Sequence, residues 1–169
     1  GLTGKGFEFL AEMERMHMIV DVSHLSDKGF WDIVEHGTRP FAASHSNCRA
    51  LAPHTRNLTD EMIRALSERG GIAGLNYYAP FLDTDPTHPE NCRSTVELIA
   101  KHAAHYKQVG GAQMIALGSD FDGIDGPHQL ENAAFLPLLA DALRKEGFAE
   151  DEVEGIYYRN AMRFFEENL

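Results

Sequence analysis

Two histidines and one aspartate stand just beyond short apolar segments: His24 follows residues 18–22, His45 follows residues 40–44 and Asp120 follows residues 114–117. Neutral imidazole is a strong ligand for zinc and similar divalent ions. A carboxylate beside such an ion can orient a bound water molecule or accept its proton, as is usual in metal-assisted hydrolysis. The three residues therefore indicate a hydrolytic metal site. The alternative is that each is an ordinary hydrogen-bonded loop residue, as a single histidine after a strand usually is.

Two further polar segments accompany these residues. The loop of residues 54–59 contains Arg56, which can bind a substrate carboxylate through a bidentate ion pair or can simply be a solvated surface arginine. Residues 120–126 (DFDGIDG) superficially resemble a calcium-binding loop with Glu131 as its last ligand, but they follow a strand-like segment where such a loop requires a helix. The other histidines are interpreted as solvated or structural: His17, His36, His88, His102, His105 and His128.

Alternating apolar segments predict the elements that position these side chains. Short strands are expected at residues 18–22, 40–44, 72–75 and 114–117. Amphipathic helices are expected at about residues 3–17, 27–36, 60–69, 94–109, 131–146 and 150–167, with a long surface loop at 77–92. Short apolar strands separated by helices are typical of an α/β protein with a parallel sheet. Because functional residues of such sheets gather at the carboxyl ends of the strands, His24, His45 and Asp120 are expected on one face.

The composition limits which classes of binding partner and which cellular compartment we expect for the protein. The 169 residues include 15 Lys and Arg against 26 Asp and Glu, and the net charge of −11 disfavours nucleic acid and anionic membranes. No run of about 18 apolar residues predicts a membrane span, and no signal peptide is recognisable. Cys48 and Cys92 lack zinc-site spacing and read as reduced thiols, which favours a cytoplasmic protein. The length fits one domain, and the start at Gly1 rather than Met is expected to be a cut from a longer chain.

Five ordered motifs give the sequence a family resemblance. They are DVSH at residues 21–24, ASHSNCRAL at 43–51, HTRNLTDEMI at 54–63, GGIAGLN at 70–76 and IALGSDFDG at 115–123, and RNAMRFFEENL closes the chain at 159–169. In this order and spacing they resemble the membrane (renal) dipeptidase family, peptidase family M19, of the amidohydrolase superfamily. The resemblance covers essentially the whole chain and implies a TIM-like (β/α)8 metallo-hydrolase barrel with two zinc ions.

The resemblance also implies a role for each residue singled out above. His24 and His45 are similar to two ligands of one zinc ion, and Arg56 is similar to the residue that binds the carboxylate of a dipeptide. Asp120 resembles the residue that binds the substrate amine and transfers the catalytic proton. The implied activity is that of a zinc-dependent dipeptidase, in which a metal-bound hydroxide hydrolyses the peptide bond of a dipeptide.

One part of the family pattern is missing. The first zinc of the family is held by a His-x-Asp pair, and no such pair occurs in this chain; the bridging glutamate of the family also lies upstream of DVSH. Residues 1–169 therefore resemble a single partial domain, the C-terminal half of the barrel, with about four βα units that correspond to strands five to eight. Such a half-barrel, with at most a partial zinc site, is expected to be inactive alone and to form a homodimer or associate through its exposed edges.

Two alternatives to a dipeptidase fragment stay open from the sequence. One is a non-catalytic binding or assembly module with the same half-barrel fold. The other is a different amidohydrolase-type hydrolase, such as a lactonase or a deacetylase. Arg56 favours a substrate that carries a carboxylate, and hence a dipeptide.

Overall fold

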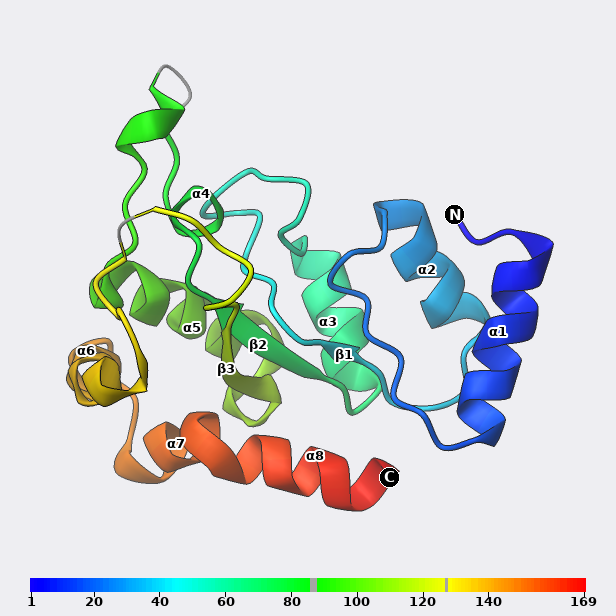
Figure 1. The fold of residues 1–169 in the computed structure, drawn as a ribbon. Helices are drawn as coiled ribbons and strands as arrows, with labels where there is room; N and C mark the ends of the chain where they lie inside the picture. The colour runs from blue at the N-terminus through cyan, green and yellow to red at the C-terminus, as the bar shows by residue number, and fades with distance from the viewer. Residues whose placement is uncertain (86–87, 127) are drawn as a thin grey trace.

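A sheet of three parallel strands lies at the centre of the protein, for which we describe a computed structural model of residues 1–85, 88–126 and 128–169 (Figure 1). The strands lie in the order β1 (Ala42–Ala43), β2 (Ile72–Asn76) and β3 (Ile115–Ser119). In the register, Ala42 pairs with Ile72, and Ala73 pairs with Ile115. Because the strands are parallel, their carboxyl ends meet at one edge, which collects the residues that follow each strand.

The prediction of a strand at residues 18–22 is wrong. Within this segment Asp21 alone forms a bridge, to Ala42 of β1. Two backbone hydrogen bonds flank the bridge: Val22 N donates to the Ala42 oxygen (2.8 Å), and Ala42 N donates to the Val20 oxygen (2.9 Å). The described residues thus form three strands rather than four, because this edge segment pairs only with β1, which is itself two residues long. The bridge is parallel, so the segment still ends at the same edge as the strands.

The helices occupy positions close to those expected from the sequence. In the described residues they are α1 (Gly4–Arg15), α2 (Asp27–His36), α3 (Asp60–Glu68), α4 (Ala79–Leu82), α5 (Val96–Gly110), α6 (Leu136–Lys145), α7 (Glu150–Glu154) and α8 (Asn160–Asn168). Short 3-10 turns are η1 (Pro89–Asn91), η2 (Ala112–Met114) and η3 (Ala133–Phe135), and a π turn, η4 (Gly155–Arg159), joins α7 to α8. The expected loop at 77–92 contains α4, which Pro80 favours because proline suits a first helical turn. No helix among these described residues is long and apolar enough to span a membrane.

Side-chain caps fix where four helices begin. The hydroxyl oxygens of Thr3, Ser26, Thr59 and Thr95 each accept a hydrogen bond from a backbone N–H three residues later. Two of these caps, at residues 26 and 59, lie next to the candidate site residues. These caps fix the starts of α2 and α3, which directly follow the loops that contain His24 and Arg56. The C-terminal end of each loop is therefore held by a helix.

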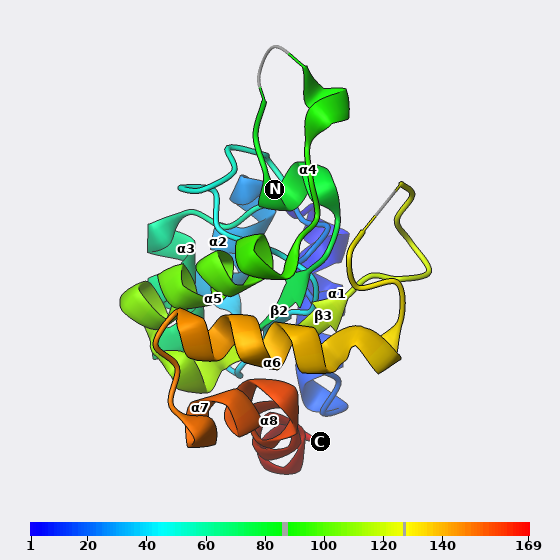
Figure 2. The ribbon, with the colours of Figure 1, turned by 90° about the vertical axis from the view of Figure 1, so that its left-hand side faces the viewer.

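The helices cover the two faces of the sheet differently. On one face, α5 lies between α3 and α6, as the two views in Figures 1 and 2 show together. Ala73 and Leu75 of β2 point into the large core beneath these helices. The alternate strand residues form a small second cluster with α8: Ala42, Ile72, Ala116 and Phe164. Helices α1 and α2 lie on the β1 side of the molecule, far from α6 (Figure 1).

Two glycines let the three strands approach closely at their carboxyl ends. A Cβ atom at Gly74 of β2 would collide with the carbonyl oxygen of Ser44, just after β1. A Cβ atom at Gly118 of β3 would collide with the same oxygen and with the Gly74 backbone. Because the obstructing atoms belong to the backbone, a larger side chain cannot be accommodated by a rotamer change. These glycines therefore set the position of Ser44, which precedes His45.

We expect Gly74→Ala to lower the free energy of unfolding by roughly 1–3 kcal/mol, because the added methyl group overpacks a site bounded by backbone. Urea unfolding followed by circular dichroism measures this change through its midpoint. Gly4→Ala in α1 is the matched control, since a Cβ atom there meets nothing within 4 Å. Equal midpoints for the two variants would contradict the close approach at Gly74.

Candidate metal and substrate site

His24 and His45 face each other at the carboxyl edge of the sheet. Their Nε2 atoms lie 2.9 Å apart, and their ring centroids lie 4.9 Å apart. His24 is exposed and His45 is half-buried. The sequence predicts that these residues share one face, and the structure brings their ring nitrogens into direct contact.

The ring of His45 is held from its other nitrogen. Its Nδ1 lies 2.7 Å from the Ser44 hydroxyl oxygen, and that hydroxyl lies 2.5 Å from Oδ2 of Asp21. Burial lowers the pKa of His45; the carboxylates of Asp120 and Asp21 raise it, and the positive charge of Arg56 lowers it further. The net shift is downward, so the neutral imidazole that ligates metals is favoured at neutral pH.

Arg56 completes the contact group. Its Nη2 lies 3.3 Å from Nε2 of His24, and its Cζ atom lies 5.5 Å from the ring centroid of Phe81, within cation–π range. The backbone N–H of Arg56 donates to Nδ1 of His54, whose ring packs on Phe81. Its Nη1 is buried without a hydrogen-bond partner among the described residues. A buried guanidinium nitrogen without an acceptor is costly, so this group is suited to an incoming anion.

Asp120 stands at an irregular end of β3. The register between β2 and β3 shifts after Leu75, and Ser119 and Asp120 have φ values of 27° and 71°. Non-glycine residues in this region are uncommon, although aspartate tolerates it better than most. Oδ2 of Asp120 accepts a hydrogen bond from Nδ2 of Asn76 (3.0 Å), and the same amide nitrogen lies 3.4 Å from the carbonyl oxygen of His45. Asn76 thus links Asp120 to the histidine pair.

Three buried asparagines, which are not among the residues predicted from the sequence, support the site. Nδ2 of Asn47 and Nδ2 of Asn57 both donate to the carbonyl oxygen of Phe81, and Oδ1 of Asn47 accepts from the backbone N–H of Asn76. All three are completely buried. They fix the loop under Arg56 to the ends of the strands. Their sequence signal is an uncharged polar residue directly beside a strand end or a candidate site residue, at positions 47, 57 and 76.

His102 is structural, as the sequence predicts. It is buried in α5, its Nδ1 accepts from the backbone N–H of Cys48 (3.0 Å), and its Nε2 lies 3.1 Å from the carbonyl oxygen of Leu82. Burial lowers the pKa of His102 to about 4. The neutral ring therefore ties α5 to the loops after β1 and α4.

We expect His102 to make the fold labile in mild acid. Its folded-state pKa lies below the usual value of about 6.5, so the unfolded chain binds more protons between these values and stability falls as the pH drops. The loss from His102 should be about 2 kcal/mol between pH 7 and pH 5. Urea unfolding at both pH values measures it, with His102→Asn as the comparison. An equally steep loss in the variant would contradict the assignment.

The side chains fit part of a metal site rather than a complete one. Two imidazole nitrogens converge on one point, and imidazole suits zinc. Catalytic zinc normally takes three protein ligands, and the described residues contain no group of three His, Cys, Asp or Glu that could hold a metal ion. Cys48 is buried and Cys92 is half-buried, both as free thiols, and neither adds a third ligand to the histidine pair.

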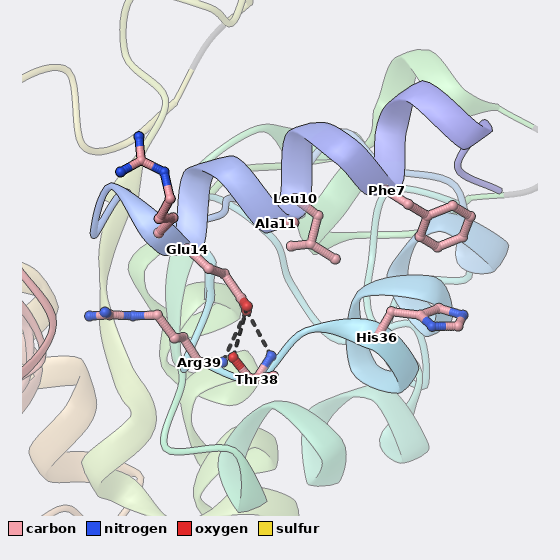
Figure 3. Close-up of a pocket in the computed structure, with 8 residues that line it drawn as sticks. Phe7, Leu10, Ala11, Glu14, His36, Thr38 and Arg39 are labelled. Atoms are coloured by element: carbon pink, nitrogen blue, oxygen red, sulfur yellow. Dashed lines mark hydrogen bonds between the residues drawn. The ribbon is translucent and has the colours of Figure 1, made fainter.

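A cavity of about 590 Å³ lies elsewhere, between α1 and the end of α2 (Figure 3). The Glu14 carboxylate points into it and accepts hydrogen bonds from the backbone N–H groups of Thr38 (2.7 Å) and Arg39 (3.0 Å). Its lining residues include none of His24, His45 or Arg56. The cavity therefore does not form part of the candidate site.

Comparison with known proteins identifies the family. The sequence model described as membrane dipeptidase (peptidase family M19) matches residues 1–168. The chain belongs to this family. An uncharacterized dipeptidase of Schizosaccharomyces pombe is 33% identical over 165 residues, which are 96% of this chain and 39% of that protein. An uncharacterized protein of Klebsiella pneumoniae, from the pqqA 5′ region, is 38% identical over 96% of this chain and 59% of its own length.

Solved structures agree with the M19 assignment. A metallo peptidase from Rhodobacter sphaeroides, bound to a phosphinate mimic of the dipeptide L-Ala-D-Ala, superposes with a TM-score of 0.91 at 32% identity. The match covers 100% of this chain and 48% of that one. The chain thus has an α/β fold similar to that of M19 metallo peptidases, and its three parallel strands are consistent with part of a barrel. It spans about half the length of the relatives it matches.

Proposed function

We propose that this chain supplies one metal-binding position and the substrate-carboxylate site of a zinc-dependent dipeptidase. The observation that carries the proposal is the contact group of His24, His45 and Arg56, with two imidazole nitrogens 2.9 Å apart and a guanidinium nitrogen 3.3 Å from one of them. A ligand position beside a half-buried arginine, one of whose nitrogens lacks an acceptor, suits a metal-assisted reaction on a small carboxylate-bearing substrate. The dipeptide mimic bound to the Rhodobacter sphaeroides relative supports the same substrate class.

Each residue has a distinct task in this proposal. Nε2 of His24 and Nε2 of His45 hold the metal, which, when bound, polarises the scissile carbonyl and activates water. Arg56 binds the free carboxylate of the dipeptide with the nitrogen that otherwise lacks an acceptor, and so restricts the enzyme to short substrates. Asp120, oriented by Asn76, binds the substrate amine and transfers a proton to the leaving amine.

We further propose that residues 1–169 form a single partial domain that corresponds to strands five to eight of a (β/α)8 barrel. Such a barrel needs about 250 residues. The metal position described here would then be completed by residues from the first half of the barrel. The chain alone should turn over dipeptides poorly for this reason, because two imidazoles are fewer protein ligands than a catalytic zinc usually has.

The test is hydrolysis of a panel of L,L and L,D dipeptides by the natural-length protein that contains this chain, with zinc added. We expect release of free amino acids by that protein and far less by the 169-residue chain. No release from any dipeptide by the natural-length protein would overturn the proposal. Zinc binding without hydrolysis would favour a non-catalytic module, and hydrolysis of lactones or acetylated amines instead would favour another amidohydrolase-type reaction.

We also propose a cytoplasmic protein, on its two free thiols, and association of the chain through its exposed half-barrel edges. In the described sheet β3 pairs with β2 alone, and three large apolar side chains in α1 or just after it are exposed: Phe9, Met16 and Met18. An open sheet edge with exposed apolar groups favours pairing with another chain or another half of a barrel. Sedimentation velocity on the 169-residue chain should reveal dimers or larger species at micromolar concentration, and a lone monomer peak would contradict association.

A further inference from the structure

A chain of hydrogen bonds runs from the sheet edge to the ring of His45. Oδ1 of Asp21 accepts from two backbone N–H groups, those of Ser23 (3.1 Å) and Ser44 (3.0 Å). Its other oxygen, Oδ2, lies 2.5 Å from the Ser44 hydroxyl, which lies 2.7 Å from Nδ1 of His45. The carboxylate is thus fixed at one oxygen by the backbone and presents the other to the Ser44 hydroxyl.

The direction of each hydrogen bond follows from which of the three groups has a proton to donate. An ionised carboxylate can only accept, so the Ser44 hydroxyl donates its one proton to Asp21. The Ser44 oxygen then has only lone pairs to offer His45. Nδ1 of His45 must therefore carry the proton, and Nε2 is left with a free lone pair.

The contact with His24 does not decide this arrangement. The two Nε2 atoms can share a hydrogen bond in either direction. Nη2 of Arg56 can only donate, and at 3.3 Å from Nε2 of His24 it favours the direction in which His45 is the donor. This contact is longer than the 2.5 Å and 2.7 Å contacts on the Asp21–Ser44 side. The Asp21–Ser44 side is therefore the side that selects between the two neutral forms of His45. The backbone also holds this side in place, since Gly74 and Gly118 pack against the Ser44 carbonyl.

We propose that Asp21 is a positioning residue that acts through Ser44 to hold His45 in the form protonated at Nδ1. In the proposed function, on which its purpose rests, this leaves Nε2 unprotonated and aimed at the metal position beside His24. Asp21 and Ser44 are accessible to solvent in this chain, so their effect on His45 depends on the hydrogen-bond geometry rather than on burial.

The substitution Asp21→Asn is expected to change which ring nitrogen of His45 carries the proton. The two backbone N–H groups at Oδ1 require the amide oxygen of asparagine at that position. The NH2 group then occupies the Oδ2 position and donates to the Ser44 oxygen. The Ser44 hydroxyl must turn its proton toward Nδ1 of His45, which becomes an acceptor. His45 should therefore exchange its proton from Nδ1 to Nε2 with little change in the fold.

The test is ¹⁵N NMR of histidine-labelled, metal-free protein at pH 8, where free imidazole is neutral. In the wild type we expect His45 Nδ1 to resonate as a protonated nitrogen and Nε2 as an unprotonated one. In Asp21→Asn the two should exchange, and in Ser44→Ala both should show a mixture. Ser46→Ala, which removes a neighbouring hydroxyl bonded to Ser23 rather than to a His45 ring nitrogen, is the matched control and should keep the wild-type pattern.

A second measurement separates this inference from the proposed function. Zinc affinity, measured by competition with a chelating dye, should fall about 10- to 100-fold in Asp21→Asn and should not change in Ser46→Ala. Wild-type nitrogen signals in Asp21→Asn would overturn the inference and leave the dipeptidase proposal intact. Exchange of the signals without any zinc binding in the wild type would support the role of Asp21 and overturn the proposed metal position.

Discussion

Asp120→Asn should lower kcat/KM for dipeptide hydrolysis by the natural-length protein by about 10²- to 10⁴-fold, the usual contribution of a positioned general acid or base. Asparagine keeps the shape of the side chain and its contact with Asn76 but cannot carry a proton to the leaving amine. Ser119 and Asp120 already have positive φ values, so the side chain is aimed by a backbone that asparagine also tolerates. The fold should therefore survive the change.

Steady-state kinetics with one dipeptide measures the effect, and Asp122→Asn is the matched control. Asp122 is exposed and lies two residues after Asp120, and its substitution by asparagine removes the same charge. We expect near wild-type kinetics for the control. Comparable losses in the two variants would show a general effect of negative charge in this loop, and would contradict a role of Asp120 in proton transfer.

Arg56→Ala should raise the free energy of the transition state by about 2–5 kcal/mol, or roughly 30- to 5,000-fold in kcat/KM, through loss of the carboxylate contact. Nη1 is buried without a partner, and burial lowers the pKa of Arg56, against the opposing effect of Asp120 and Asp21. Removal of this half-buried cation leaves the substrate carboxylate without a counter-charge. The loss should therefore depend on that carboxylate.

Dipeptides with a C-terminal carboxamide test this dependence directly. The wild-type protein should hydrolyse the carboxamide poorly, and Arg56→Ala should cause little further loss with it. Arg64→Ala in α3 is the control, because Arg64 is an exposed arginine outside the contact group. An equal loss with free dipeptide and carboxamide would mean that Arg56 supports the loop rather than the substrate.

The candidate site residues could be predicted from the sequence because each follows an apolar segment. In a parallel arrangement that position alone places His24, His45 and Asp120 at one edge, whatever the exact strand limits are. Residues 18–22 illustrate this point, because they do not form the predicted strand. A single parallel bridge at Asp21 is enough to place His24 at the same edge. The apolar pattern reports that a segment is buried, but the length of its pairing depends on a neighbour that the pattern does not specify.

Other features depend on contacts between distant segments. Asn47 and Asn57 lie in the segment between β1 and α3, and Asn76 is the last residue of β2. Their hydrogen bonds become visible only when this segment, the end of β2 and Phe81 meet. The proton position on His45 depends on Asp21, 24 residues earlier in the sequence, through a serine hydroxyl. Motifs located these residues, but geometry alone shows which atoms donate and which accept.

Anomalous diffraction at the zinc edge, from crystals of the natural-length protein grown with zinc, tests the proposed metal position most directly. We expect a peak within bonding distance of the Nε2 atoms of both His24 and His45, with the Arg56 guanidinium group beside it. Zinc bound elsewhere, with neither imidazole as a ligand, would contradict the proposed site.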